Sequence, residues 1–132
     1  MKRSTFMLIM AVLALVFGVI MFFIPSLAAK QMGLDFTIYT SSLLRGMGGL
    51  IIGNGLINLL TRNTKDFTPL KSILLTNVIM HALGLSADVW GVVDGALTVS
   101  KMAPVEITHL FSGICSLVYL IYLHKAAHIR TS

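Results

Sequence analysis

The sequence has 132 residues, of which 56% are hydrophobic and 11% are charged, and its formal net charge is +5 at pH 7. This composition excludes an ordinary soluble domain, in which about a quarter of the residues are charged. Long apolar runs fill most of the chain and leave little length for a separate soluble part. We therefore expect a single transmembrane domain over residues 1–132.

The first apolar run covers residues 5–24 and follows Lys2 and Arg3. A helix of about 20 residues crosses a hydrocarbon core of roughly 30 Å, so this run is long enough to span a bilayer. A cleaved signal peptide is the alternative, because "SLA" at residues 26–28 is an acceptable cleavage pattern. The run exceeds the usual apolar core of a signal peptide, about 7 to 15 residues, so we expect a helix of the mature protein.

The segment after this run, residues 25–36, contains a proline, a serine and a glycine in an arrangement typical of a short helix. Ser26 is a suitable residue to cap the start of a helix, and Gly33 is a suitable residue to end one. We expect one or two helical turns here, lying on the outer surface of the membrane.

Three more apolar runs follow, over residues 38–60, 69–94 and 104–123. Backbone hydrogen bonds cannot be left open in lipid, and runs of this length are too long for barrel strands, so each run must be a helix. The sequence thus predicts an all-α fold, an integral membrane bundle of four transmembrane helices over about 5–24, 38–60, 69–94 and 104–123.

Basic residues predict the orientation of this bundle. Of the 10 Lys and Arg residues, seven fall on the side of the two termini, two fall on the other side, and Arg45 lies inside a span. Because Lys and Arg concentrate in cytoplasmic loops, both termini are expected in the cytoplasm. We attribute the positive charge to topology and to anionic lipid headgroups, and we expect no nucleic-acid partner. The seven are Lys2, Arg3, Arg62, Lys65, Lys71, Lys125 and Arg130, against Lys30 and Lys101.

Ionisable residues inside the spans form the candidate site. A charge in the hydrocarbon costs roughly 2.5 to 3.5 kcal/mol on insertion scales, so such residues usually have a partner. At about 1.5 Å of rise per residue, Arg45, Asp88 and His109 share a layer roughly 7 to 10 Å below the outer surface. We expect Arg45 to pair with Asp88 or Asp94. The predicted ligand-binding or ion-pair cluster comprises Arg45, Asp88, Asp94, Glu106, His109 and His81.

Two interpretations of this cluster remain open. It is either a structural ion-pair network or a ligand site open to the outer leaflet, in which His81 and His109 titrate near neutral pH. Cys115 is the only cysteine, which excludes an internal disulfide and a thiol redox pair. His124 and His128 lie one helical turn apart without a third ligand nearby, so we expect no metal site. No catalytic residue and no cofactor is predicted.

Two glycine pairs have the spacing of helix-packing motifs. They are "GLIIG" at residues 49–53 and "GVVDG" at residues 91–95, and small residues four apart let two helix backbones approach closely. We therefore expect Gly49, Gly53, Gly91 and Gly95 to pack helices. Four polar residues are candidates for hydrogen bonds between helices: Asn54, Asn58, Asn77 and Ser116.

The order of these motifs resembles a known family. A proline after the first span is followed by "RGMGGLIIGNGL", then "DVWGVVDG", then "APVEI" at the start of the last run. This order is similar to that of the small bacterial membrane proteins known as domain of unknown function 4345. The resemblance covers nearly the whole chain and implies a four-helix inner-membrane fold without an established activity. The residues that match the family's recurring positions are Arg45, Asp94, Gly95 and Glu106.

Two functions compete on the sequence alone. The favoured one is a structural or accessory subunit of a membrane assembly, because the chain is small and carries no catalytic motif. Its partners would be membrane lipids and either another membrane protein or a second copy. The alternative is a site for a lipid, a quinone or another small ligand, with or without proton coupling, in the outer half of the bundle. An enzyme is the least favoured class.

Overall fold

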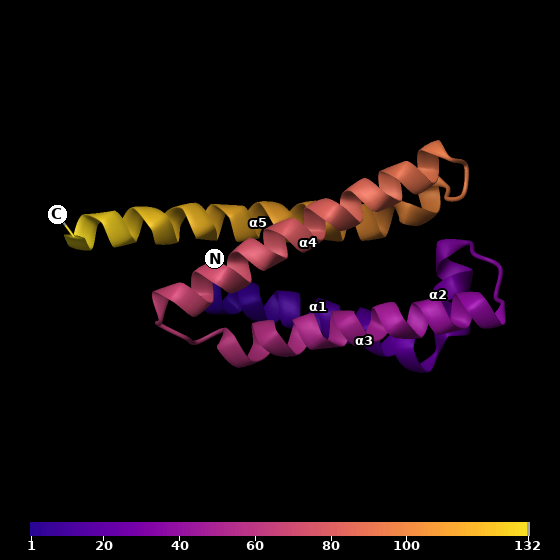
Figure 1. Ribbon diagram of the computed structural model, residues 1–132, viewed down its shortest axis with the longest axis horizontal. Coiled ribbons are helices and arrows are strands. Elements are labelled where there is room, and N and C mark those ends of the chain that lie inside the picture. The colour runs from indigo at the N-terminus through magenta and orange to yellow at the C-terminus, as the bar shows by residue number, and fades with distance from the viewer. Residues whose placement is uncertain (132) are drawn as a thin grey trace.

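The computed structural model describes the backbone of residues 1–131 and the side chains of residues 1–125 (Figure 1). This part of the chain is all-α, with five helices and no strand. Four of the helices are long and apolar enough to cross a membrane, which confirms the predicted all-α, multi-span class. The fifth is a short helix between the first two spans. The helices are α1 (Arg3–Phe23), α2 (Pro25–Met32), α3 (Ile38–Thr61), α4 (Phe67–Val93) and α5 (Val99–Thr131).

Helix α2 occupies the segment for which one or two helical turns were expected. Pro25 stands at its start, where a missing backbone N–H leaves no hydrogen bond unmade. Gly33 ends it in the left-handed conformation with a φ of 73°, as predicted. The predicted cap by Ser26 is wrong, because Ile24 precedes the first helical residue and no side chain caps the helix.

Helix α5 begins at Val99, ahead of the predicted start near residue 104. Pro104 is therefore inside the helix, where its missing N–H removes the hydrogen bond that residue 104 would otherwise donate to the carbonyl oxygen of Ser100. At about 1.5 Å per residue, a helix of this length exceeds the roughly 30 Å of a hydrocarbon core. Residues 99–125 form its candidate membrane span.

The long helices pack as two hairpins. Most contacts between helices join α1 to α3 and α4 to α5, and far fewer join one pair to the other. Both termini and the α3–α4 loop lie at the left of Figure 1, whereas α2 and the α4–α5 turn lie at the right. We call the left end the basic end, because six described Lys and Arg side chains belong to it, and the right end the α2 end. The six are Lys2, Arg3, Arg62, Lys65, Lys71 and Lys125.

Three glycines bring α1 and α3 close together. A Cβ atom added at Gly48 would lie 2.7 Å from the backbone nitrogen of Phe22 and 2.8 Å from the carbonyl oxygen of Gly18. A Cβ at Gly18 would lie 2.9 Å from the carbonyl oxygen of Gly48, and one at Gly55 would lie 2.9 Å from Cγ of Leu15. These distances are shorter than any side chain tolerates, so the hairpin depends on glycine at these positions.

The four glycines that were predicted to pack helices do not lie in the close contact between α1 and α3. A Cβ at Gly49 would come no closer than 3.9 Å to the Phe22 ring, and at Gly53 it would meet nothing within 4 Å. Gly91 faces the side chain of Leu97, at 2.6 Å, in the segment that follows α4. Gly95 has a φ of 73° and serves the turn. The close packing between helices thus lies one residue before Gly49, on the face of α3 that also buries Leu44.

The two hairpins are joined mainly at the basic end. Five fully or almost fully buried side chains from α1 and α4 form a core there, against which Tyr119 of α5 packs. The Tyr119 hydroxyl donates a hydrogen bond to the carbonyl oxygen of Met1 at 2.6 Å, and the Arg3 guanidinium donates one to the carbonyl oxygen of Thr64. The five core residues are Phe6, Met7, Met10, Leu70 and Leu74.

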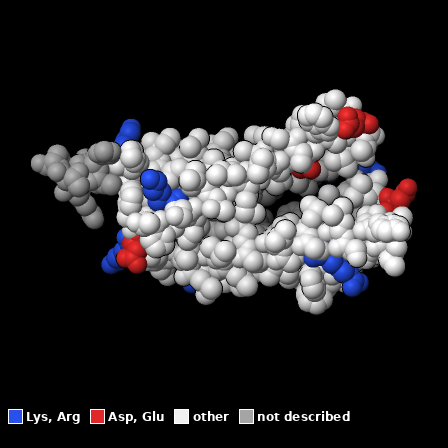
Figure 2. Space-filling view, in the orientation of Figure 1, with Lys and Arg blue, Asp and Glu red and all other residues white. Residues whose placement is uncertain are grey.

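Toward the α2 end the hairpins separate. Figure 2 shows a hollow between them in this half of the molecule. Helix α2 stands across its far end, where the Lys101 side chain of α5 lies over Gly33, with Cδ 2.7 Å from the position of an added Cβ. The hollow is therefore bounded by the core at the basic end and by α2 at the other end.

Candidate functional site

Four ionisable side chains meet along the contact between α4 and α5. Nδ1 of His81 lies 2.9 Å from Nδ1 of His109, and Nε2 of His109 lies 3.7 Å from Oδ2 of Asp88. The carboxyl group of Glu106 interacts with that of Asp88. We call these four residues the polar cluster.

Helix geometry explains why these side chains converge. His81 and Asp88 are seven residues apart on α4, and Glu106 and His109 are three apart on α5, so each pair lies on one helix face. The structure therefore brings together four of the six residues that the sequence analysis grouped.

Glycine makes room for the two imidazoles. A Cβ atom added at Gly84 of α4 would lie 2.6 Å from Cε1 of His109, so the His109 ring rests directly on the α4 backbone. A Cβ at Gly113 of α5 would lie 3.4 Å from Cβ of His81. Each histidine thus faces a glycine of the opposite helix, and this exchange lets the two rings meet between the helices.

The contact between the two histidines limits where their protons can lie. In the contact between His81 and His109, one Nδ1 must donate and the other must accept, so both rings cannot be cationic while it holds. A neutral His109 that turns Nε2–H toward Asp88 has a bare Nδ1, which accepts from Nδ1–H of His81. The outer nitrogen of His81, Nε2, is then left as an acceptor.

Two acceptors of the polar cluster are buried without a hydrogen-bond partner in the described part of the chain. They are Nε2 of His81 and Oε2 of Glu106. A buried polar atom without a partner costs about 1 to 3 kcal/mol, so both atoms favour a bound group that donates hydrogen bonds. Ser112 and Ser116 of α5 are fully buried, and each has an unpaired hydroxyl oxygen.

Arg45 does not join the polar cluster. Its side chain is exposed on α3, and no ion pair among the described residues links it to Asp88 or Asp94. Arg45 and Asn54 are nine residues apart on α3. Because a helix turns by about 100° per residue, the two side chains lie on opposite faces of α3. Because Asn54 lies on the side of Asn58, which faces α4, Arg45 points away from the second hairpin. The structure therefore does not contain the expected pair of Arg45 with Asp88 or Asp94.

Asp94 also lies outside the polar cluster. It is exposed and follows the last residue of α4, where its backbone N–H donates to the carbonyl oxygen of Trp90 at 2.9 Å. The carboxylate therefore belongs to the turn between α4 and α5.

Two buried asparagines connect the two hairpins by hydrogen bonds. Nδ2 of Asn77 donates to Oδ1 of Asn58 at 2.9 Å, and Nδ2 of Asn58 donates to Oδ1 of Asn77 at 3.3 Å. Nδ2 of Asn58 also donates to the carbonyl oxygen of Asn54 at 3.0 Å. The predicted hydrogen bond between helices is therefore confirmed for Asn58 and Asn77, which we call the asparagine pair. Asn54 supports it from within α3, and Ser116 takes no part.

No protein-family model matches the chain. No curated protein and no solved structure matches it either. The resemblance to domain of unknown function 4345 stays a prediction. The geometry of the described residues is the basis on which we infer function.

Proposed function

We propose that this chain is a multi-pass membrane protein that binds a small organic cation with N–H donors at the polar cluster. The observation that carries the proposal is the pair of unpartnered buried acceptors, Nε2 of His81 and Oε2 of Glu106, beside Asp88. An ammonium group offers three donors and a positive charge, which match two acceptors and two carboxylates.

The charges around the polar cluster favour a cation over an anion. Asp88 and Glu106 repel one another when both are ionised, and a proton or a bound cation between them removes that repulsion. Arg45 is turned away, and Lys101 lies over Gly33 at the α2 end. A quinone or a lipid carbonyl would bring an oxygen, itself a hydrogen-bond acceptor, against the acceptors of the polar cluster. These ligands therefore fit less well than an amine, which donates hydrogen bonds.

The site is reachable from outside the helix contact. The side chains of His109 and Asp88 are 23% and 19% exposed, so a ligand can reach them without unpacking α4 from α5.

Proton coupling follows from the same geometry. When both imidazoles are cationic, both Nδ1 atoms carry protons, so the contact between His81 and His109 breaks and positive charge is added beside Asp88 and Glu106. That charge competes with a bound ammonium ion for the carboxylates, so uptake of a proton and release of the cation are linked.

A thermal unfolding assay in mild detergent tests the cation site. Benzylammonium should raise the unfolding midpoint, whereas benzoate, of similar size and opposite charge, should not. Glu106→Gln should reduce the shift, because it removes a carboxylate from the polar cluster. Asp94→Asn is the matched control, since it removes an exposed acid at the same end and should keep the shift. Equal shifts with benzoate, or an unchanged shift in Glu106→Gln, would contradict the proposal.

An accessory subunit is the second candidate. Only 11% of the most apolar window of α4, and 11% of that of α5, is buried, against 33% for α1. The α4–α5 hairpin therefore has the most surface left for another membrane protein or a second copy. Native mass spectrometry of the extracted protein decides this point, since a stoichiometric protein partner supports the accessory role and a monomer carrying a small cation supports the first proposal.

We also propose the bacterial inner membrane as the location, with both termini in the cytoplasm, and membership in domain of unknown function 4345. The six basic side chains of the basic end support this orientation, against Lys30, Lys101 and Arg45 toward the other end. A fluorescent protein fused after the last residue should fluoresce, and alkaline phosphatase at the same position should be inactive. The reverse pattern would place the termini outside.

A further inference from the structure

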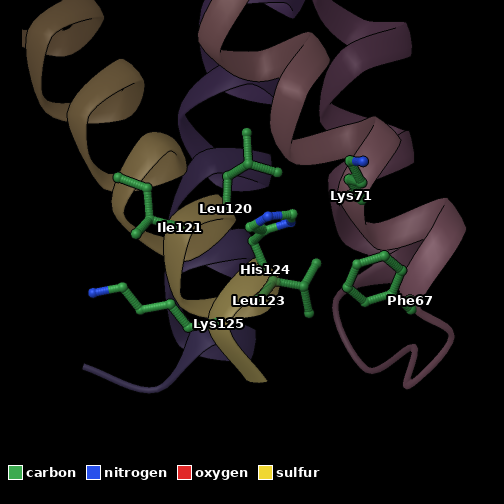
Figure 3. Close-up of a pocket in the computed structure, with 7 residues that line it drawn as sticks. All are labelled: Phe67, Lys71, Leu120, Ile121, Leu123, His124 and Lys125. Atoms are coloured by element: carbon green, nitrogen blue, oxygen red, sulfur yellow. The ribbon is translucent and has the colours of Figure 1, made fainter. Parts of the chain in front are cut away.

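A pocket of about 390 Å³ lies at the basic end, between the start of α4 and the last described turns of α5 (Figure 3). Its volume is within the roughly 300 to 1,000 Å³ of small-molecule sites. The pocket is separate from the polar cluster, which lies toward the α2 end. Seven of the described residues line it: Phe67, Lys71, Leu120, Ile121, Leu123, His124 and Lys125.

The lining of this pocket is apolar with a basic rim. Phe67, Leu120 and Leu123 supply carbon surface, and no acid is among the lining residues. The side chains of Lys71 and Lys125 are exposed and stand on opposite sides of the group in Figure 3, the first on α4 and the second on α5. An occupant of this pocket must therefore combine hydrocarbon with negative charge.

The depth of the pocket matches the level of lipid headgroups. Phe67 is the first residue of the third candidate span, so the pocket lies at one end of that span. Lysines at the ends of spans bury their carbon stems and extend the ammonium to the interface. Basic pockets between transmembrane helices are suited to anionic headgroups.

We propose that this pocket binds one anionic phospholipid, with its phosphate at the basic rim to which Lys71 and Lys125 belong and an acyl chain against Phe67, Leu120 and Leu123. Inorganic phosphate would leave the apolar lining without a partner. A zwitterionic phosphatidylcholine brings its own cation toward the two lysines. An anionic phospholipid satisfies both parts of the pocket.

Phosphatidylglycerol binding to the purified protein in mild detergent tests the site, measured by native mass spectrometry and by the thermal unfolding midpoint. We expect one bound phosphatidylglycerol and a higher midpoint, with no comparable effect of phosphatidylcholine or of inorganic phosphate. Lys71→Gln with Lys125→Gln should weaken this binding about tenfold or more. Lys2→Gln with Lys65→Gln removes the same charge at the same end outside the pocket and should leave binding within about twofold.

A second variant tests the apolar part without changing charge. Leu123→Trp places a large ring where the acyl chain would lie and should also abolish the midpoint shift. Leu110→Trp, at an exposed position of α5 outside the pocket, is its control. The proposal is overturned if both lysine pairs reduce binding equally, if inorganic phosphate or phosphatidylcholine gives the same shift, or if Leu123→Trp binds phosphatidylglycerol as the unaltered protein does.

Discussion

His81 and His109 meet at their Nδ1 atoms, 2.9 Å apart, and each histidine faces a glycine of the opposite helix. His109 of α5 rests on Gly84 of α4, and His81 of α4 faces Gly113 of α5. Each helix thus makes room for the histidine of the other with a glycine. Substitutions at these glycines therefore report on the position of the rings.

We expect Gly84→Ala to destabilise the protein by about 1 kcal/mol, the lower end of the usual cost of overpacking, because the His109 side chain can move aside. The new methyl group would lie 2.6 Å from Cε1 of His109 and would push the ring away from His81. Thermal unfolding in detergent measures the loss. Gly53→Ala is the control, because nothing lies within 4 Å of its added Cβ. Similar midpoints for the two variants would refute the contact.

Gly48→Ala should destabilise the α1–α3 hairpin, whereas Gly49→Ala should have little effect. The added Cβ at Gly48 would lie 2.7 Å from the backbone nitrogen of Phe22, and backbone cannot move aside as a side chain can. The expected cost is about 1 to 3 kcal/mol from overpacking. Chemical unfolding of both variants measures the difference. A larger loss at Gly49 would show that the predicted packing motif, rather than the observed one, joins these helices.

Asn58→Leu should leave the amide of Asn77 buried without its partner. Hydrogen bonds between membrane helices contribute about 0.6 kcal/mol on average and up to about 1.7, so we expect a loss in this range. Asn58→Leu with Asn77→Leu should recover part of it, because no buried amide then remains unpaired. A double-mutant cycle measures the coupling. Additive losses would show that the asparagine pair does not act as a unit.

Arg45→Gln should change the stability by less than about 0.5 kcal/mol, as is usual for an exposed residue without a close partner. Arg3→Gln should cost more, because the Arg3 guanidinium donates to the carbonyl oxygen of Thr64. Thermal unfolding of the two variants gives the comparison. A large loss for Arg45→Gln, rescued by Asp88→Asn, would restore the ion pair expected from the sequence.

The sequence predicts where the spans lie better than which way their side chains point. Hydropathy identifies the four spans, because it follows from the chain itself. Which helices pair is a property of the assembled bundle. Arg45 points away because α3 turns the face of Leu44 and Gly48 toward α1, and spacing along one helix does not contain that information.

The polar cluster and the glycines show the same limit. His81 and Asp88 share a face of α4 by spacing alone, and His109 and Glu106 share one of α5, so their grouping was predictable. Close packing at Gly48 was missed because the spacing of four at Gly49 and Gly53 fits the familiar motif equally well. Whether Gly48 or Gly49 is the packing residue depends on which of them contacts α1.

The division into hairpins bears on the geometry of the polar cluster. All four of its residues belong to α4 and α5, so the cluster lies within one hairpin. The asparagine pair and the core at the basic end join this hairpin to the other, and the side chain of Lys101 lies over Gly33 at the α2 end. The distances within the polar cluster therefore depend on the contact between α4 and α5 and not on how the two hairpins sit relative to one another.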